Sequence, residues 1–165
     1  MHIRDALESR HVWFQHLLHR PEPCASRFAE SLHEPGDRVA KSVLVRVGDT
    51  FILAVLPATR RVDLGLLSEL NGGQVVRLAT EAEIERVFQD CERGAVPPFG
   101  RSYGLTTLLD ASLASCESFV FVGNQRHEAY RLRVSDFERI EAPTVLRFAA
   151  TTAAPADHRP RRRAG

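Results

Sequence analysis

The sequence predicts one α/β domain in which a mixed, mostly antiparallel β-sheet is flanked by helices. Short runs of branched and aromatic residues have the composition of strands, and segments with apolar residues at helical spacing lie between them. Several expected strands are separated by short turns typical of hairpins, which favours antiparallel pairing. The chain has 165 residues, 44% of them hydrophobic and 26% charged, so it can bury one core of ordinary size.

The first part of the chain alternates between helical and extended patterns. Pro35 and Gly36 stop the second helical pattern, and Gly48 with Asp49 forms the turn signal between the two strands that follow. The expected elements are a short helix over 3–10, a strand over 11–18, an amphipathic helix over 24–33, and two strands over 39–47 and 51–56.

The second part contains two helix starts with clear capping residues. Asp63 can cap one helix, and Thr80 with Glu83 has the form of a capping box for another. The stretch 105–109 is ambiguous between strand and helix, although two threonines favour a strand. The expected elements are a helix from Asp63 to about Asn71, a strand over 74–78, a helix after Thr80, a strand over 105–109, a hairpin of 118–122 with 129–134, and a short helix opening at 135–138.

Composition excludes several classes of protein. The net charge of +1 gives no domain-wide field for nucleic acid, so a phosphate-bearing partner would have to meet a local patch. No apolar run has the length of a membrane span or a signal peptide, so we expect a cytoplasmic protein without a membrane partner. We expect the domain to cover 1–150, followed by a disordered basic tail over 151–165.

Cysteines and histidines give little indication of a metal site or a cofactor. The three cysteines are far apart and form no CxxC pair. His11, His16 and His19 lie close in sequence, but their spacing along a strand does not bring them to one face. Cys91 is conceivable as a nucleophile, although the neighbouring Glu92 disfavours a thiolate. We therefore expect no metal and no cofactor.

Lys41 is the single lysine of the chain and lies in an unusual position. On a strand over 39–47, residues 39, 41, 43, 45 and 47 share one face and read Val, Lys, Val, Val, Val. The lysine could lie at the end of the strand with its ammonium in water. Alternatively, it could hold its ammonium at the mouth of an apolar pocket, where it would meet a carbonyl or phosphate oxygen.

The stretch GAVPPFG, residues 94–100, can be neither a helix nor a good strand. Two adjacent prolines remove two backbone donors and fix two φ angles, and a glycine stands at each end. The stretch could be only a tight connection between two elements. It could also present unobstructed N–H groups to a ligand oxygen, as an oxyanion hole or a phosphate cradle does.

These two features together resemble the YbaK/EbsC family of free-standing aminoacyl-tRNA deacylases, which is related to the editing insertion domain of bacterial prolyl-tRNA synthetases. An AKSV strand start at 40–43 is followed about fifty residues later by a GxxxP loop that begins at Gly94. The resemblance extends over roughly 8–142 and includes His19, AVLPATRRVDLGLL, LLD at 108–110 and SDFER at 135–139. It implies a partly barrel-like sheet.

The resemblance also implies a function and a site. Such proteins hydrolyse the ester that joins a wrong amino acid to the 3′-terminal adenosine of tRNA, without a metal, and an aminoacyl-tRNA synthetase can be a second partner. Lys41 and Gly94 would be the catalytic residues, with the attacking water positioned by the ribose hydroxyl of the substrate. The expected substrate-binding residues are Ala95, Val96, Pro97, Pro98, Phe99, Gly100, Asp110, Gln125 and His127.

One departure from the family pattern concerns the amino-acid pocket. Relatives often carry Gly-x-His where this chain has Gly123, Asn124 and Gln125, with His127 two residues further on. The amino acid removed by a relative therefore cannot be transferred to this chain, and the oligomeric state is also open. Two other functions remain: a non-catalytic module that binds the aminoacyl-adenosine end of tRNA or a synthetase, and a hydrolase of a different small ester or amide.

Overall fold

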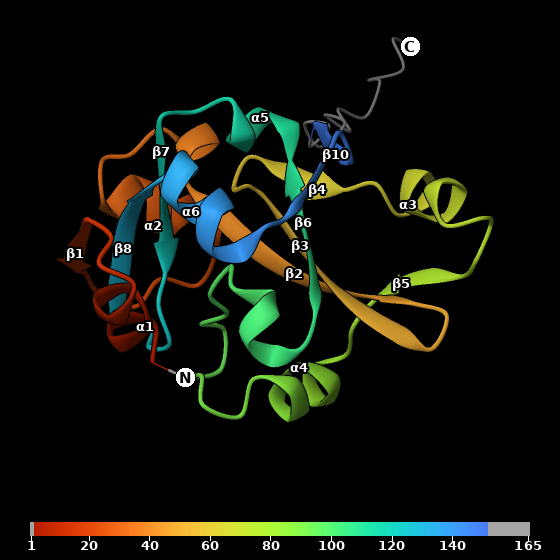
Figure 1. Cartoon of the computed structure of the whole chain (residues 1–165), viewed down its shortest axis with the longest axis horizontal. Coiled ribbons are helices and arrows are strands. Elements are labelled where there is room, and N and C mark those ends of the chain that lie inside the picture. The colour runs from red at the N-terminus through yellow and green to blue at the C-terminus, as the bar shows by residue number, and fades with distance from the viewer. Residues whose placement is uncertain (1, 152–165) are drawn as a thin grey trace, which may run out of the picture.

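The computed structural model describes residues 2–151, and its strands form three sheets (Figure 1). The five-stranded sheet has the order β5-β2-β3-β6-β9, the three-stranded sheet has the order β1-β8-β7, and β10 pairs with β4. The strands are β1 (Phe14–Leu18), β2 (Ala40–Val47), β3 (Thr50–Pro57), β4 (Arg60–Val62), β5 (Val76–Leu78), β6 (Thr106–Asp110), β7 (Ser118–Val122), β8 (Glu128–Arg133), β9 (Thr144–Leu146) and β10 (Ala149–Thr151).

Six α-helices flank these sheets. They are α1 (Ile3–Ser9), α2 (Ala25–Ser31), α3 (Leu64–Leu70), α4 (Glu81–Val87), α5 (Ala111–Ala114) and α6 (Val134–Glu141). In Figure 1 the three-stranded sheet lies on the left with α1 and α2, and β2 and β3 run from there toward α3 on the right. The mixed α/β fold is confirmed, and the sheets do not close into a barrel within residues 2–151.

Most pairings are the antiparallel ones that the turn signals predict. β2 and β3 pair along their whole length, from Ala40 opposite Pro57 to Val47 opposite Thr50. Gly48 takes the positive φ of 56° that closes this hairpin. β6 resolves the ambiguity over 105–109, because it is a strand parallel to both β3 and β9.

The structure departs from the expected boundaries near the N-terminus. The expected strand over 11–18 begins only at Phe14, because His11 has a φ of 53° and its N–H donates to the carbonyl of Glu8 at 3.0 Å. This turn ends α1 and redirects the chain before β1 starts. The sequence patterns also gave no sign of α5 or of the three-residue strands β4, β9 and β10.

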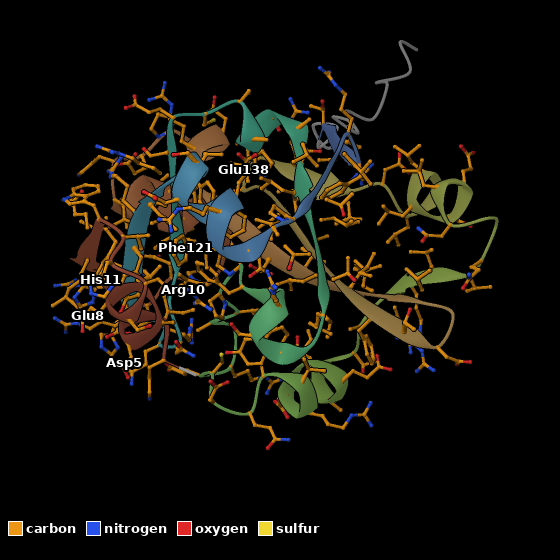
Figure 2. The ribbon with its side chains drawn as sticks, viewed as in Figure 1. Asp5, Glu8, Arg10, His11, Phe121 and Glu138 are labelled. Carbon is orange, nitrogen blue, oxygen red and sulfur yellow. The ribbon has the colours of Figure 1, made fainter. Side chains whose placement is uncertain are left out.

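The core lies on both faces of the five-stranded sheet. On one face, Phe99, Phe119, Phe121 and Phe137 are fully buried and pack ring against ring, with centroids 5.1 to 5.9 Å apart. Figure 2 shows Phe121 in the interior, whereas Asp5, Glu8, Arg10 and His11 lie around α1 at the surface.

The second face of the sheet has its own cluster, which includes Val45, Leu56, Leu67 and Phe148. Leu44, on the opposite side of β2 from Val45, belongs to the aromatic cluster. β2 is therefore buried on both faces, and the Lys41 side is not distinguished by greater apolarity.

The two larger sheets meet at the start of β2. A bridge joins Val39 to Val120 of β7, and both residues are fully buried. β5 pairs only with Val45 to Val47, so the first half of β2 has no β5 neighbour. This junction places the beginning of β2, with Lys41, close to the three-stranded sheet. No helix within residues 2–151 is long and apolar enough to span a membrane.

Candidate active site

A cavity of about 280 Å³ lies at this junction, and it brings together segments that are far apart in the chain. Its wall includes Lys41 at the start of β2, Cys24 and Phe28 at α2, and Gly94 and Val96 of the loop over 94–100. The remaining lining residues are His19, Glu22, Pro23, Ala25, Ala40, Ser42, Glu81, Ile84, Val122 and Arg126. Lys41 and Gly94, predicted from the sequence to share a site, therefore line the same cavity.

Lys41 is half-buried, and its ammonium has spare hydrogen-bonding capacity. Its Nζ donates to the carbonyl oxygen of Ala58 at a long 3.5 Å, which engages one of three donors. Burial lowers the pKa of Lys41 below its ordinary value, and the nearby Cys24 thiol acts in the opposite direction. A cation that is partly removed from water and incompletely bonded can interact strongly with a substrate oxygen.

The loop over 94–100 begins with a backbone geometry that favours glycine. Gly94 has a φ of 83°. The Ala95 N–H donates to Glu92 at 2.8 Å, so this amide is engaged. Within residues 2–151 the amides of Gly94 and Val96 have no hydrogen-bond acceptor, so both are available to a ligand at the cavity wall.

The start of the loop is tied to the turn between β7 and β8. The Glu92 N–H donates to the carbonyl of Asn124, and the Arg126 N–H donates to the Glu92 carboxylate, both at 2.8 Å. The buried Asn124 side chain also accepts from the Ile3 N–H at 2.8 Å. These bonds fix the segment just before Gly94 against the three-stranded sheet and against α1.

The rest of the loop packs into the protein behind the cavity. Ala95, Pro97, Pro98, Phe99 and Gly100 are buried and do not line it. The Phe99 ring lies between the rings of Phe121 and Phe137, and it therefore supports the loop from the core side. A Cβ at Gly100 would come within 2.5 Å of Thr107 Oγ1, so only glycine fits there without movement.

Asp110 is placed away from the cavity and organises the chain around it. Its carboxylate accepts from the N–H of Ser112, which caps α5, and from the N–H groups of Phe148 and Ala149 at 3.1 and 2.9 Å. Burial favours a raised pKa for Asp110, but a hydrogen bond from the Ser112 hydroxyl together with these backbone bonds outweighs it, and the pKa is lowered. The structure thus gives this aspartate three backbone partners and no place at the cavity wall.

The turn between β7 and β8 contributes a residue that the sequence did not single out. Gln125 and His127 are exposed and do not line the cavity, whereas Arg126 between them does. The His127 carbonyl accepts from the His19 N–H at 3.0 Å. The departure from Gly-x-His indicated that this turn affects specificity. It did not indicate which residue of the turn lines the cavity.

His16, His19 and Cys91 lie against aromatic side chains, and His19 also lines the cavity. The His16 ring stacks on Tyr130, with centroids 4.9 Å apart, and the His19 ring packs against Phe28 at 4.7 Å. Burial raises the pKa of the Cys91 thiol, which lies 3.4 Å from the Tyr103 hydroxyl. A raised pKa disfavours the thiolate that a nucleophilic cysteine needs.

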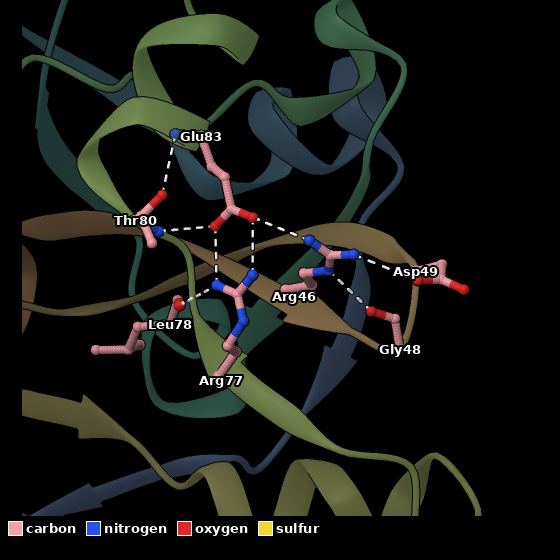
Figure 3. Close-up of polar contacts among 7 residues, drawn as sticks. All are labelled: Arg46, Gly48, Asp49, Arg77, Leu78, Thr80 and Glu83. Carbon is pink, nitrogen blue, oxygen red and sulfur yellow. Dashed lines mark hydrogen bonds and ion pairs between the residues drawn. The ribbon is translucent and has the colours of Figure 1, made fainter.

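Helix α4 carries Glu81 and Ile84 to the cavity and has a reciprocal cap. The Glu83 N–H donates to Thr80 Oγ1 at 3.2 Å, and the Thr80 N–H donates to the Glu83 carboxylate at 2.8 Å (Figure 3). This is the capping box that the sequence predicts. The same carboxylate also accepts from Arg46 of β2 at 3.0 Å, which holds the helix to the sheet.

The protein is an α/β domain in which a lysine and two loop amides without acceptors within residues 2–151 belong to residues that line one cavity. Comparison with known proteins identifies the protein family to which such a domain belongs. The model of the aminoacyl-tRNA editing domain matches residues 19–140, which is most of the chain. The chain therefore belongs to the aminoacyl-tRNA editing domain family. This confirms the resemblance inferred from the AKSV start and the GxxxP loop.

Particular relatives are known from both sequence and structure. The multifunctional Ser/Thr-tRNA deacylase ProXp-y of Escherichia coli K12 is 30% identical over 101 residues, which are 61% of this chain and 60% of the relative. The protein of that name from Escherichia coli O157:H7 matches to the same extent. The chain thus spans about 60% of the length of these curated relatives.

Two solved structures have the same fold. One is a hypothetical protein with a TM-score of 0.80 at 18% identity, covering 90% of this chain and 99% of its own. The other is a candidate trans-editing enzyme for prolyl-tRNA synthetase, with a TM-score of 0.76 at 22% identity, covering 90% and 94%. At these identities the likeness shows the fold alone.

Proposed function

We propose that this chain is a trans-editing hydrolase that cleaves the ester of mischarged aminoacyl-tRNA. The observation that carries the proposal is the position of Lys41 and Gly94 on one cavity, in a chain that belongs to the aminoacyl-tRNA editing domain family. The curated relatives, described as Ser/Thr-tRNA deacylases, support the same reaction class. A synthetase that releases the mischarged tRNA is the second partner that this function implies.

The chemistry needs a water molecule and stabilisation of charge at the ester carbonyl. Water attacks the carbonyl carbon, the bond from that carbon to the ribose oxygen breaks, and the ribose oxygen takes up a proton. Negative charge develops on the carbonyl oxygen in the transition state. The donors that residues of this wall can offer to it include the amides of Gly94 and Val96 and the Lys41 ammonium.

The volume of the cavity agrees with a site for the end of the substrate only. About 280 Å³ accommodates an amino-acid side chain with its ester, while the rest of the tRNA has to lie outside. Phe28, Ile84 and Val122 supply an apolar part of the wall. The amino acid would therefore enter the cavity, and the terminal adenosine would lie at its mouth.

The proposal is tested by a deacylation panel of mischarged tRNAs with the wild type, K41A and K41M. K41M keeps the apolar stem of the lysine and removes only the charge. We expect both variants to lose about a hundredfold in kcat on the preferred substrate, since a donor that stabilises developing charge acts on kcat. R139M, which removes an exposed charge on α6, is the control and should retain wild-type kcat.

Two outcomes would contradict the hydrolase function, and a third would change the role assigned to Lys41. If no aminoacyl ester in a wide panel is cleaved while a known family member cleaves its own, the hydrolase function is wrong. Tight binding of an uncleavable aminoacyl-adenosine without turnover of the ester would favour the non-catalytic binding module instead. An effect of K41M on KM alone would move the lysine from the reacting carbonyl to a binding contact with the nucleotide.

A further inference from the structure

The charged groups around the cavity suggest how a substrate is oriented in it. Besides His19 and Cys24, four ionisable side chains of opposite sign line the wall: the cations Lys41 and Arg126 and the carboxylates Glu22 and Glu81. An aminoacyl ester carries a cation of its own, the α-ammonium group, one carbon away from the ester carbonyl. A site that receives the carbonyl at a lysine therefore needs an acceptor nearby for this ammonium.

Glu81 is the less suitable of the two carboxylates. Its side chain is 67% exposed, and its Oε2 is paired with Arg93 Nε at 3.2 Å. An exposed carboxylate that already has a guanidinium partner gains little from a second cation, because water screens the interaction. Glu81 therefore lies at the rim of the cavity with its charge largely satisfied.

Glu22 has a different environment. It is half-buried, and the flanking prolines, Pro21 and Pro23, restrict the backbone on both sides. Arg126 Nη2 donates to the Glu22 carbonyl oxygen at 3.1 Å, so the arginine fixes the main chain and leaves the carboxylate unengaged by that bond. Within residues 2–151 no Lys, Arg or His nitrogen lies within 4.0 Å of the Glu22 carboxylate as an ion-pair partner.

Lys41 and Glu22 also do not neutralise each other. The Lys41 ammonium donates to the Ala58 carbonyl, and no ion pair joins it to the Glu22 carboxylate within residues 2–151. A cation and a carboxylate whose residues line one cavity without an ion pair between them leave room for a ligand, although Lys41 also lines a second cavity beside Val43. The ligand that fits has an oxygen for the lysine and a cation for the carboxylate, which is the pattern of an aminoacyl ester.

We propose that the Glu22 carboxylate binds the α-ammonium group of the substrate and thereby makes a free amino group a condition of cleavage. This inference rests on the proposed hydrolysis of aminoacyl esters and adds a specificity rule to it. An ester whose amino group is acylated has no cation for Glu22 and presents an amide to a half-buried carboxylate. Peptidyl and N-formylaminoacyl esters, which have the same ester bond, are thus spared.

The test compares one aminoacyl-tRNA with its N-acetylated form, using the wild type, E22Q and E81Q. We expect the wild type to cleave the free-amine ester at least about tenfold faster, which is the range of a charge-assisted hydrogen bond. E22Q should cleave the free-amine ester more slowly than the wild type does and the N-acetylated ester at the wild-type rate, so that the preference is lost. E81Q should keep the wild-type ratio of the two cleavage rates. A wild-type ratio retained by E22Q, or lost by E81Q, overturns the assignment to Glu22.

A binding measurement separates this inference from the proposed function. The probe is 3′-aminoacylamino-3′-deoxyadenosine, in which an amide replaces the ester, with its amino group free or acetylated. We expect E22Q to bind the free-amine probe about tenfold more weakly and the acetylated probe as the wild type does. Equal affinity of the wild type for both probes refutes the role of Glu22, whether or not the protein cleaves esters. Failure to cleave, with the amine preference in binding intact, counts only against hydrolysis.

Discussion

The Arg77 guanidinium holds the Glu83 carboxylate by two hydrogen bonds, each 2.8 Å long, and so ties edge strand β5 to the first turn of α4 (Figure 3). Arg46 of β2 approaches the same carboxylate, so one side chain joins two strands and a helix. The hydrogen bonds from Arg77, with further support from Thr80 and Arg46, hold the pKa of Glu83 well below its ordinary value. Because α4 carries Ile84 to the cavity, this junction also positions part of the candidate site.

Removal of this charge should change how stability depends on pH. A carboxyl group with a lowered pKa in the folded state stabilises the protein above the pKa of the unfolded state, about 4.5, and loses this contribution as pH falls further. We expect E83Q to lower Tm at pH 7 and to flatten the fall in Tm between about pH 4.5 and pH 2.5. Thermal unfolding by circular dichroism measures both.

E85Q is the matched control for E83Q. Glu85 lies on the same helix, and its 57% exposed side chain has one ion-pair contact within residues 2–151, with Arg93 at 3.7 Å. Its replacement should leave Tm and its pH profile unchanged, because an exposed pair of this kind contributes little to stability. Identical profiles for E83Q and the wild type would show that the junction has no role in acid stability.

The positive φ angles of two glycines allow a backbone effect to be separated from a site effect. Gly94 has a φ of 83° at the cavity, and Gly104 has a φ of 71° elsewhere. A Cβ would meet only Arg126 at 4.0 Å in the first case and nothing within 4 Å in the second, so both substitutions act mainly through backbone strain.

We expect G94A and G104A each to destabilise the protein by about 1 kcal/mol, the usual cost of alanine at a positive φ. Only G94A should also lose deacylation activity, because it alone moves the amides at the cavity wall. Chemical denaturation and single-turnover assays give the two quantities. An equal loss of activity in both variants would mean that the Gly94 loop has no special part in the reaction.

The Glu141 carboxyl, at the end of α6, is buried and holds the turn that follows the loop. It accepts hydrogen bonds from the Arg101 N–H at 2.7 Å and from the Thr107 hydroxyl. Burial raises the pKa of Glu141 in spite of these bonds. The folded state therefore prefers the protonated form, and the contribution of Glu141 to stability falls as pH rises from about 4.5 through the raised pKa.

We expect E141Q to keep both hydrogen bonds and to remove this decline, so that its stability relative to the wild type increases with pH above about 4.5. E141A leaves the Arg101 amide and the Thr107 hydroxyl without their acceptor and should cost about 2 kcal/mol. Urea unfolding at several pH values tests both variants. A constant difference between E141Q and the wild type across pH would rule out the ionisation of Glu141 as the cause.

The basic tail lies outside the described residues, and we propose for it a role in contacting tRNA phosphates without regard to sequence. Deletion of 152–165 removes the RPRRR run. We expect weaker binding to all tRNAs, with a shallower dependence of affinity on salt, because fewer counterions are released. Filter binding at several salt concentrations measures the slope. A slope unchanged by the deletion would exclude a direct phosphate contact.

Local signals predicted much of the fold, and long-range packing determined the rest. The caps at Asp63 and Thr80 and the β2–β3 hairpin depend on residues close in sequence, and they are present as expected. β4, β9 and β10 have three residues each, too few for an alternating pattern, and they are strands only because partners pair with them.

The candidate site likewise combines residues that local sequence signals indicated with residues that only long-range packing places there. Proline chemistry and family resemblance indicated Lys41 and the Gly94 loop, and both line the cavity. Strand alternation did not distinguish Lys41, because both faces of β2 are buried. Glu22 and Arg126 lie in irregular segments, and only the packing of α2 and the β7–β8 turn brings them to the cavity wall. Side chains in loops carry no periodic signal that shows which way they face.

The hydrogen bonds of Asn124 connect the beginning of the described chain to the candidate active site, although no residue of α1 lines the cavity. Asn124 receives the Ile3 N–H with its side chain and the Glu92 N–H with its carbonyl, so α1 and the segment before Gly94 are anchored to one residue. A fusion partner or affinity tag attached in front of α1 would pull on this anchor. Activity measured on such a fusion would then report the state of the linker as well as that of the cavity.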